Sequence, residues 1–275
     1  MSAGCGGVDW EDRWRLMQAA AEPAFVMAAG ADPWHERAAR FDAACGAAAA
    51  VEVEALSEGL CREDHVADLG AGTGRHALAI AQRCAVLTAI EPSAAMRARL
   101  QARIASEGAQ ITVVAEAWPC ALAPVDVAYS AHVLYGVHDA VSFLESMTRA
   151  ARRSCRLLLG LRPPSEKLAP LARELHGGSL GPRPAALEVL CLLHQLGHRA
   201  FLRVLDGGDR ASTVAPTDAA LDELSARLRL GRDDATRARV RATLDRLYPR
   251  SSTADPWNLG ISSAQALIEW PGRGH

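Results

Sequence analysis

Three glycines alternate with other residues at positions 70, 72 and 74, shortly after the acidic Asp68. Glycine lets the main chain turn sharply and lets a ligand approach the backbone closely. These glycines follow a short apolar run at residues 65–69 and precede a helical pattern, so they join a buried strand to a helix. Glu91 ends the next apolar run, where an acidic side chain can accept hydrogen bonds from ribose hydroxyls. The pattern predicts a site for a nucleotide-like ligand at the ends of these strands.

The spacing of the glycines differs from the dinucleotide fingerprint. That fingerprint is Gly-x-Gly-x-x-Gly, and Arg75 stands where its third glycine should be. The difference counts against a nicotinamide enzyme, although a glycine turn alone would also suit a nicotinamide or flavin site.

His132 and Tyr135 follow the apolar run at residues 125–130 and are candidates for acid–base chemistry. A histidine that titrates near neutral pH can take a proton from a reacting nucleophile. The alternative for His132 is a packing or capping role. His138 stands just before a predicted helix, which favours a cap or a surface position.

Four segments in this order resemble the motifs of the Rossmann-like, class I, S-adenosylmethionine-dependent methyltransferases. Residues 66–74 read VADLGAGTG and resemble the first motif; residues 89–93 read AIEPS, precede Met96, and resemble the second. Residues 114–119 read VAEAWP and are similar to the third, and residues 126–134 are similar to the fourth. Each motif alone is weak, but together they cover about residues 35–162 in the expected order.

The resemblance implies S-adenosylmethionine as the cofactor and assigns a role to each motif residue. Asp68 would order the glycine loop through backbone N–H groups and face the ammonium end, and Glu91 would hold the ribose. Trp118 would stack beside the adenine or cover the edge of the sheet. The other implied cofactor contacts are the loop residues Gly70, Ala71, Gly72 and Gly74, the adenine-side residues Pro92, Met96 and Glu116, and Ser130 at the end of strand four.

Strands and helices alternate along most of the chain, which predicts a doubly wound parallel sheet. The pattern predicts strands at 65–69, 85–90, 110–115, 125–130 and 155–161, and helices at 74–84, 93–106 and 139–152. Helices at 184–196, 217–230 and 234–247 and strands at 198–205 and 264–270 follow. The resemblance implies a mostly parallel seven-stranded sheet of order 3-2-1-4-5-7-6, with strand seven antiparallel.

Three regions are expected from these elements. Residues 1–60 would form an N-terminal helical cap, residues 61–206 and 261–275 the cofactor-binding domain, and residues 207–260 a helical insertion that acts as a substrate lid. In the cap, Trp10, Trp14, Trp34 and Phe41 would pack or close over the cofactor, and Arg37 could meet its carboxylate.

The insertion is rich in arginine, partly balanced by acidic residues, which is typical of a solvated helical face. The alternative is that these arginines bind an acidic substrate or RNA. Trp257 and Trp270 either wall a substrate cavity or pack the sheet. The arginines of the insertion are Arg227, Arg229, Arg232, Arg237, Arg239, Arg241, Arg246 and Arg250.

The composition limits the classes of partner. The net charge is −2, which gives no sign of a nucleic-acid partner. No apolar run could span a bilayer, and the N-terminus lacks the pattern of a signal peptide, so a cytoplasmic protein without a membrane partner is expected. The 7 cysteines are odd in number and contain no Cys-x-x-Cys pair, so neither a disulfide framework nor a metal site is expected.

The sequence therefore predicts methyl transfer from S-adenosylmethionine to a small-molecule acceptor, with the accepting atom (O, N, S or C) open. The alternatives are another reaction of the same cofactor, such as aminocarboxypropyl transfer or cyclisation, or a non-catalytic cofactor-binding protein. A macromolecular acceptor stays open, and the expected state is a monomer or homodimer.

Overall fold

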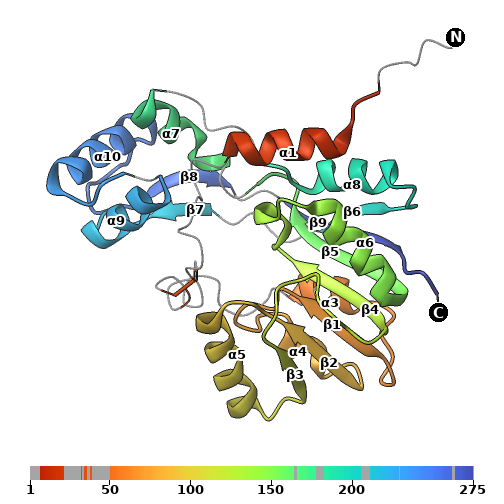
Figure 1. The fold of residues 1–275 in the computed structure, drawn as a ribbon. Coiled ribbons are helices and arrows are strands. Elements are labelled where there is room, and N and C mark those ends of the chain that lie inside the picture. Colours follow the sequence, from red (N-terminus) through yellow and green to blue (C-terminus); the bar gives the residue numbers. More distant parts are fainter. Residues whose placement is uncertain are drawn as a thin grey trace, which may run out of the picture.

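The computed structural model describes residues 7–21, 32, 34–35, 38, 50–163, 166–177, 183–205, 211–228, 230–261 and 264–274. Within these ranges the chain forms a large sheet with helices on both faces and a smaller helical lobe beside it (Figure 1). None of the helices in the described part of the chain is long and apolar enough to cross a membrane.

The large sheet contains seven strands in the order β3-β2-β1-β4-β5-β9-β6. The first five of these strands pair in parallel, and β9 runs antiparallel to both β5 and β6. The predicted order is confirmed, with β9 in the place of the seventh strand. The strands are β1 His65–Leu69, β2 Val86–Ile90, β3 Ile111–Val114, β4 Val125–Ala131, β5 Ala151–Gly160, β6 Phe201–Leu205 and β9 Gln265–Pro271.

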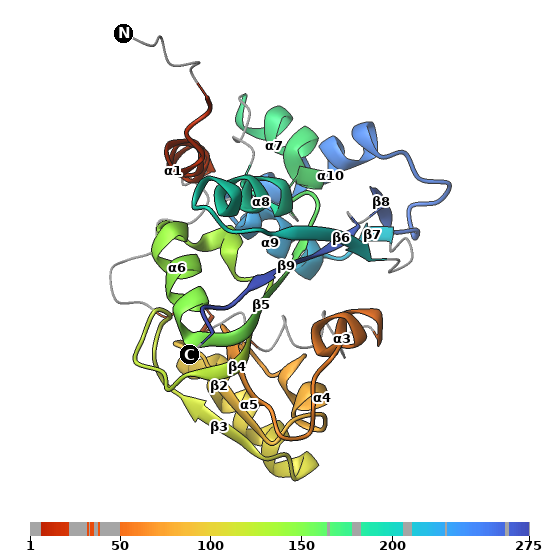
Figure 2. The same ribbon diagram turned by 90° about the vertical axis from the view of Figure 1, so that its right-hand side faces the viewer.

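Two sets of helices cover the two faces of this sheet (Figure 2). Helices α1, α6 and α8 pack on one face, and α3, α4 and α5 pack on the other. Their bounds are α1 Trp10–Ala21, α3 Ala50–Ser57, α4 Ala77–Ala81, α5 Ala94–Glu107, α6 Ala140–Ala150 and α8 Ala186–Gln195.

Local chemistry sets the starts of two of these helices. The Ser93 hydroxyl accepts a hydrogen bond from the Met96 N–H at 3.1 Å and so caps the start of α5. Asp139 caps α6 in the same way, accepting from the Ser142 N–H at 2.8 Å. The helix predicted at 139–152 ends at Ala150, because β5 already pairs with β4 from Ala151 onward.

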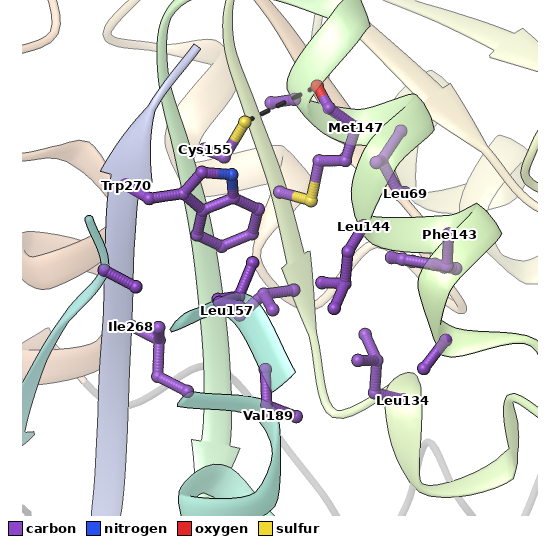
Figure 3. Packing of buried hydrophobic residues seen from close by; sticks show 14 of the residues in the cluster. Leu69, Leu134, Phe143, Leu144, Met147, Cys155, Leu157, Val189, Ile268 and Trp270 are labelled. Atoms are coloured by element: carbon purple, nitrogen blue, oxygen red, sulfur yellow. Dashed lines mark hydrogen bonds between the residues drawn. The ribbon is translucent and has the colours of Figure 1, made fainter. Parts of the chain in front are cut away.

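The core under α6 and α8 shows how the sheet is packed (Figure 3). Leu157 and Ile268 from β5 and β9 lie beneath Leu144 and Val189 from the two helices. Trp270 is 2 % exposed, and its indole N–H donates to the Thr148 hydroxyl at 2.8 Å. Trp270 thus packs the sheet, which was one of its two predicted roles.

The helical lobe consists of residues 166–176, 211–228 and 230–261. Its helices α9 and α10 confirm the predicted helical insertion between the last two strands of the large sheet, whereas α7 and the two-stranded sheet were not predicted. These elements share one apolar core that includes Leu171, Leu221, Leu244 and Trp257. They are the 3-10 turn η3 Glu166–Leu168, α7 Ala169–His176, β7 Ala211–Val214, α9 Asp218–Arg227, α10 Asp234–Leu247 and β8 Trp257–Ile261.

Three strands of the large sheet meet the lobe at one place. Gly160 ends β5, Leu205 ends β6, and both stand in register with Gln265 at the start of β9. These residues therefore mark the carboxyl edge of the parallel strands, beside the end of β4. The lobe is joined to the edge at which doubly wound sheets bind their ligands.

Candidate active site

The glycine loop between β1 and α4 needs glycine for two different reasons. Gly70 and Gly74 have φ values of +88° and +83°, and a Cβ at either position would lie 2.5 Å from a side-chain carbon of Val133 or Leu100. Gly72 has a φ of +57°, but a Cβ there would meet nothing within 4 Å. Gly72 therefore presents an open side of the loop.

Glu91 holds this loop in place from the end of β2. One carboxylate oxygen accepts from the Gly72 N–H and the other from the Ser93 N–H, each at 2.8 Å. Burial raises the pKa of Glu91, and these two hydrogen bonds partly offset the rise. The N–H groups of Gly70 and Ala71 also donate to the Ile90 carbonyl. The loop is thus fixed to β2 on both sides of the turn.

Asp68 has a different partner from the one predicted. Its carboxylate accepts from the Tyr129 hydroxyl at 2.8 Å, and the loop-ordering bond expected of it is made by Glu91. Burial raises the pKa of Asp68 to about 7, the negative charge of Glu91 adds to the rise, and the Tyr129 hydrogen bond opposes it. Ser130 is buried as well, and its hydroxyl donates to the Leu69 carbonyl at 2.6 Å.

The predicted adenine-side residues surround the ends of β2 and β3. Met96 is buried, Pro92 and Glu116 are exposed, and Trp118 is half-buried. The Trp118 indole N–H donates to the Phe143 carbonyl at 3.1 Å, and the two rings meet edge to face. Trp118 is therefore tied to α6, and its contact with an adenine stays a prediction.

His132 lies just after β4 in an uncommon backbone conformation. Its φ is 61°, which puts it alone among the described non-glycine residues at positive φ. Its Nδ1 lies 3.4 Å from the Tyr135 hydroxyl, and the two rings stack. Burial lowers the pKa of His132 to about 4, helped by the nearby His76. Strained residues often lie at functional sites, so the geometry favours a functional role for His132.

Tyr135 connects His132 to the point where the lobe is attached. It belongs to a 3-10 turn, Leu134–Gly136, and its hydroxyl accepts from the Gly160 N–H at 2.5 Å. Burial raises the pKa of Tyr135 to about 12, so the hydroxyl keeps its proton at neutral pH. His138, in contrast, is exposed, and Asp139 is the residue that caps α6.

Three more polar residues lie beside His132 that the sequence analysis did not place in the site. The Glu52 carboxylate on α3 accepts from the Arg75 guanidinium at 2.9 Å and contacts His76 Nε2 at 3.1 Å. The His76 and His132 ring centroids are 6.4 Å apart. Arg75 and His76 follow the glycine loop directly, which was the available signal; Glu52 offered none, because its partners lie in a later part of the chain.

The N-terminal segment reaches the same region. Trp14 is 2 % exposed, and its indole N–H donates to the Val137 carbonyl at 2.9 Å. Gln18 donates to the Tyr135 and Val137 carbonyls, and Asp32 accepts from the Ser93 hydroxyl at 2.8 Å. Trp10 packs against the same core, whereas the predictions for Arg37 and Phe41 lie outside the described residues.

Comparisons with known proteins agree with this arrangement. Residues 67–159 match the model of a family described as the methyltransferase domain. Two solved structures share the fold. The YcgJ protein of Bacillus subtilis is 12% identical, with a TM-score of 0.55, and the match covers 81% of this chain and 97% of that one. The BH2331 protein of Bacillus halodurans C-125 is also 12% identical, with a TM-score of 0.56, and the match covers 81% of this chain and 98% of that one. No curated protein sequence matches the chain.

Proposed function

We propose that the chain is a class I S-adenosylmethionine-dependent methyltransferase, and that it methylates a small molecule held between the carboxyl edge of the sheet and the helical lobe. One observation carries the proposal. The glycine loop bonded to Glu91 and the pair of His132 and Tyr135 both lie at that edge.

The residues around the loop fit S-adenosylmethionine. The open side of Gly72 leaves room for a ligand against the backbone. Each carboxylate oxygen of Glu91 makes one backbone hydrogen bond and can accept another from a ribose hydroxyl. Asp68 is a buried acid at the end of β1, suited to the ammonium group of the methionine part.

When bound, the cofactor supplies a methyl group on a positively charged sulfur and ends as the neutral sulfide. The acceptor atom uses a lone pair for the new bond to carbon and must lose its proton. His132 is neutral at pH 7, because burial and His76 lower its pKa to about 4. Its imidazole therefore has a free lone pair for that proton, but it is a weaker base than the near-neutral histidine expected from the sequence. The Tyr135 hydroxyl, fixed by Gly160, orients the imidazole.

The lobe would close over the acceptor and exclude water. Its attachment through Gly160, Leu205 and Gln265 favours this role, because all three lie at the carboxyl edge. Its arginines favour a small acceptor over a polyanion, since Arg237 and Arg241 are paired with acidic residues of the lobe itself.

The test is incubation with S-adenosylmethionine and a metabolite extract, followed by mass spectrometry. We expect S-adenosylhomocysteine together with a product heavier by one CH₂ group. Methylthioadenosine in its place would point to aminocarboxypropyl transfer. Tight cofactor binding without turnover would favour a non-catalytic protein, and methylation of RNA or protein fractions alone would exclude the small-molecule acceptor.

A further inference from the structure

Glu52, Arg75 and His76 form a buried ionic cluster, named here the Glu52 cluster, beside the proposed base. Glu52 and His76 are each 6 % exposed, and the Arg75 side chain is 16 % exposed. Burial would raise the pKa of Glu52, but the His76 hydrogen bond and the Arg75 charge lower it to about 2. Glu52 therefore keeps its negative charge inside the protein at neutral pH.

The cluster is costly as a purely structural device. Buried charges lose their hydration, and an incompletely bonded polar network is less favourable than an apolar core. Arg75 Nε is buried with no hydrogen-bond partner among the described residues, so the network is not fully satisfied. A function that needs a buried negative charge at this place would explain why it is kept.

Resting on the proposed role of His132 as base, we propose that Glu52, through its contacts with His76 and Arg75, is a positioning residue that supports the His132 imidazole as it takes up the acceptor's proton. The bonding pair of the acceptor's O–H, N–H or S–H stays on the acceptor atom, and the proton goes to His132. The positive charge that starts on sulfur thus ends on an imidazolium near a buried carboxylate.

The groups around His132 act on it in opposite directions. His76 and Arg75, from the start of α4, lower the pKa of His132, and Glu52, from α3, raises it. Tyr135, on the turn of His132 itself, contacts Nδ1 with a hydroxyl that stays neutral. Removing His76 should therefore make His132 easier to protonate, and removing Glu52 should make it harder.

The first experiment follows His132 by NMR in ¹³C-histidine-labelled protein without cofactor, so it needs no acceptor. We expect His76→Gln to move the titration midpoint of His132 to higher pH. Because His76 contacts Glu52 directly, the Glu52 effect is measured in the His76→Gln background, where adding Glu52→Gln should move the midpoint of His132 back to lower pH. An unmoved midpoint, or a second shift in the same direction, overturns the proposal.

The second experiment measures turnover with the acceptor identified by mass spectrometry. We expect Glu52→Gln to lower kcat by about 10- to 100-fold, less than the 100- to 10,000-fold attributed to a general base, with KM for the cofactor nearly unchanged. The matched control is Glu54→Gln on the same helix, whose carboxylate is 67 % exposed and pairs with Arg83. Equal kcat values for Glu52→Gln and Glu54→Gln overturn the proposal.

Two further variants separate this inference from the proposed function. His132→Gln with full kcat would remove the base, and the inference with it, while methyl transfer itself stands. If Glu52→Gln does not fold, Arg75→Gln takes its place in the NMR experiment, where loss of the Arg75 charge should move the His132 midpoint to higher pH. No movement in Arg75→Gln overturns the proposal.

Discussion

The carboxyl edge of the sheet and the helical lobe treat polar side chains in opposite ways. At the edge Asp68, Glu91, Glu52 and His76 are all at most 6 % exposed. In the lobe the buried residues are mainly leucine, valine and tryptophan, and ion pairs such as Arg246 with Glu174 lie at the surface. Because burying charge costs free energy, the edge is built to act on a ligand and the lobe is built to be stable.

Trp257 shows how the lobe uses its polar groups. Its ring is fully buried, its indole N–H donates to Asp245 at 2.9 Å, and the Arg250 guanidinium lies 3.9 Å from the ring centroid. The polar groups here brace a core residue. Trp257 thus packs the core of the lobe and not the large sheet, so the alternative in which it packs that sheet is wrong. Changes at the edge and changes in the lobe should therefore affect the protein differently.

The largest effect is expected from Leu244→Ala in the lobe. Leu244 is fully buried among the apolar residues of α7, α9 and β8. The cavity should cost about 3–4 kcal/mol of stability, loosen the lobe and abolish turnover, while S-adenosylmethionine still binds at the edge. Hydrogen exchange measured by mass spectrometry locates the loosening, and calorimetry measures the binding.

The control for that variant is Leu16→Ala, because Leu16 is 71 % exposed on α1. It should change neither property. Loss of cofactor binding together with turnover in Leu244→Ala, with faster exchange throughout the large sheet, would show that the lobe and the edge are one cooperative unit and would break the comparison.

Glu91→Ala should produce the next largest effect, at the edge. The change removes the acceptor for Gly72 and Ser93 and the proposed ribose contact together. Because charge-assisted hydrogen bonds contribute about 1.5–3 kcal/mol each, the Kd for S-adenosylmethionine should rise about 100-fold. Isothermal titration calorimetry measures this, with the exposed Glu107→Gln as the control. An unchanged Kd would separate Glu91 from the cofactor.

The elements of the edge could be predicted because their signals are local. The glycines and the strand–turn–helix order each lie within a few neighbouring residues, and the sheet order was implied by the family motifs. The elements of the lobe gave weaker signals. Helix α7 starts at Ala169, has Pro170 in its first turn and is only 8 residues long, and β7 reads ASTV, which lacks an alternating apolar pattern.

The partners of the site residues could not be predicted for a related reason. Glu52 meets Arg75 and His76, and Tyr129 meets Asp68, across 23 or more positions of sequence. Such contacts depend on how α3 and β4 pack against the glycine loop. The same limit explains why the loop-ordering role was assigned to Asp68 and not to Glu91.

Gly72→Ala should give a smaller effect that separates binding from stability. The positive φ of Gly72 should cost about 1 kcal/mol with a side chain, but the new Cβ meets no protein atom. We expect cofactor affinity to fall about 10-fold, equivalent to about 1.4 kcal/mol, because the methyl group occupies the open side of the loop. Thermal unfolding and calorimetry report the two quantities.

Gly70→Ala is the matched variant for this experiment. Its Cβ would lie 2.5 Å from Val133, so it should lose more stability than Gly72→Ala. If Gly72→Ala binds the cofactor as tightly as the unchanged protein, the open side of the loop does not face the cofactor.

The smallest expected effect is the pH dependence that Asp68 gives to the edge. Burial raises the pKa of Asp68 to about 7, above its unfolded value of 3.8. The folded state therefore holds this proton more tightly than the unfolded state, so the associated stability is complete below pH 3.8 and is lost as pH rises through about 7. The affinity for the cofactor should instead increase as pH rises, because the ammonium group of the cofactor favours ionised Asp68.

Calorimetry from pH 6 to pH 8, with an expected affinity gain of about 2- to 5-fold over that range, tests this prediction. Asp68→Asn should bind more weakly at high pH and lose the slope, while any titration of the cofactor itself persists in both proteins. A slope that survives in Asp68→Asn would assign the pH dependence to another group, with Glu91 the next candidate because burial raises its pKa too. In the lobe, hydrogen bonds from Trp257 and Arg250 lower the pKa of Asp245 despite partial desolvation. Asp245 should therefore add no pH dependence of cofactor affinity in this range.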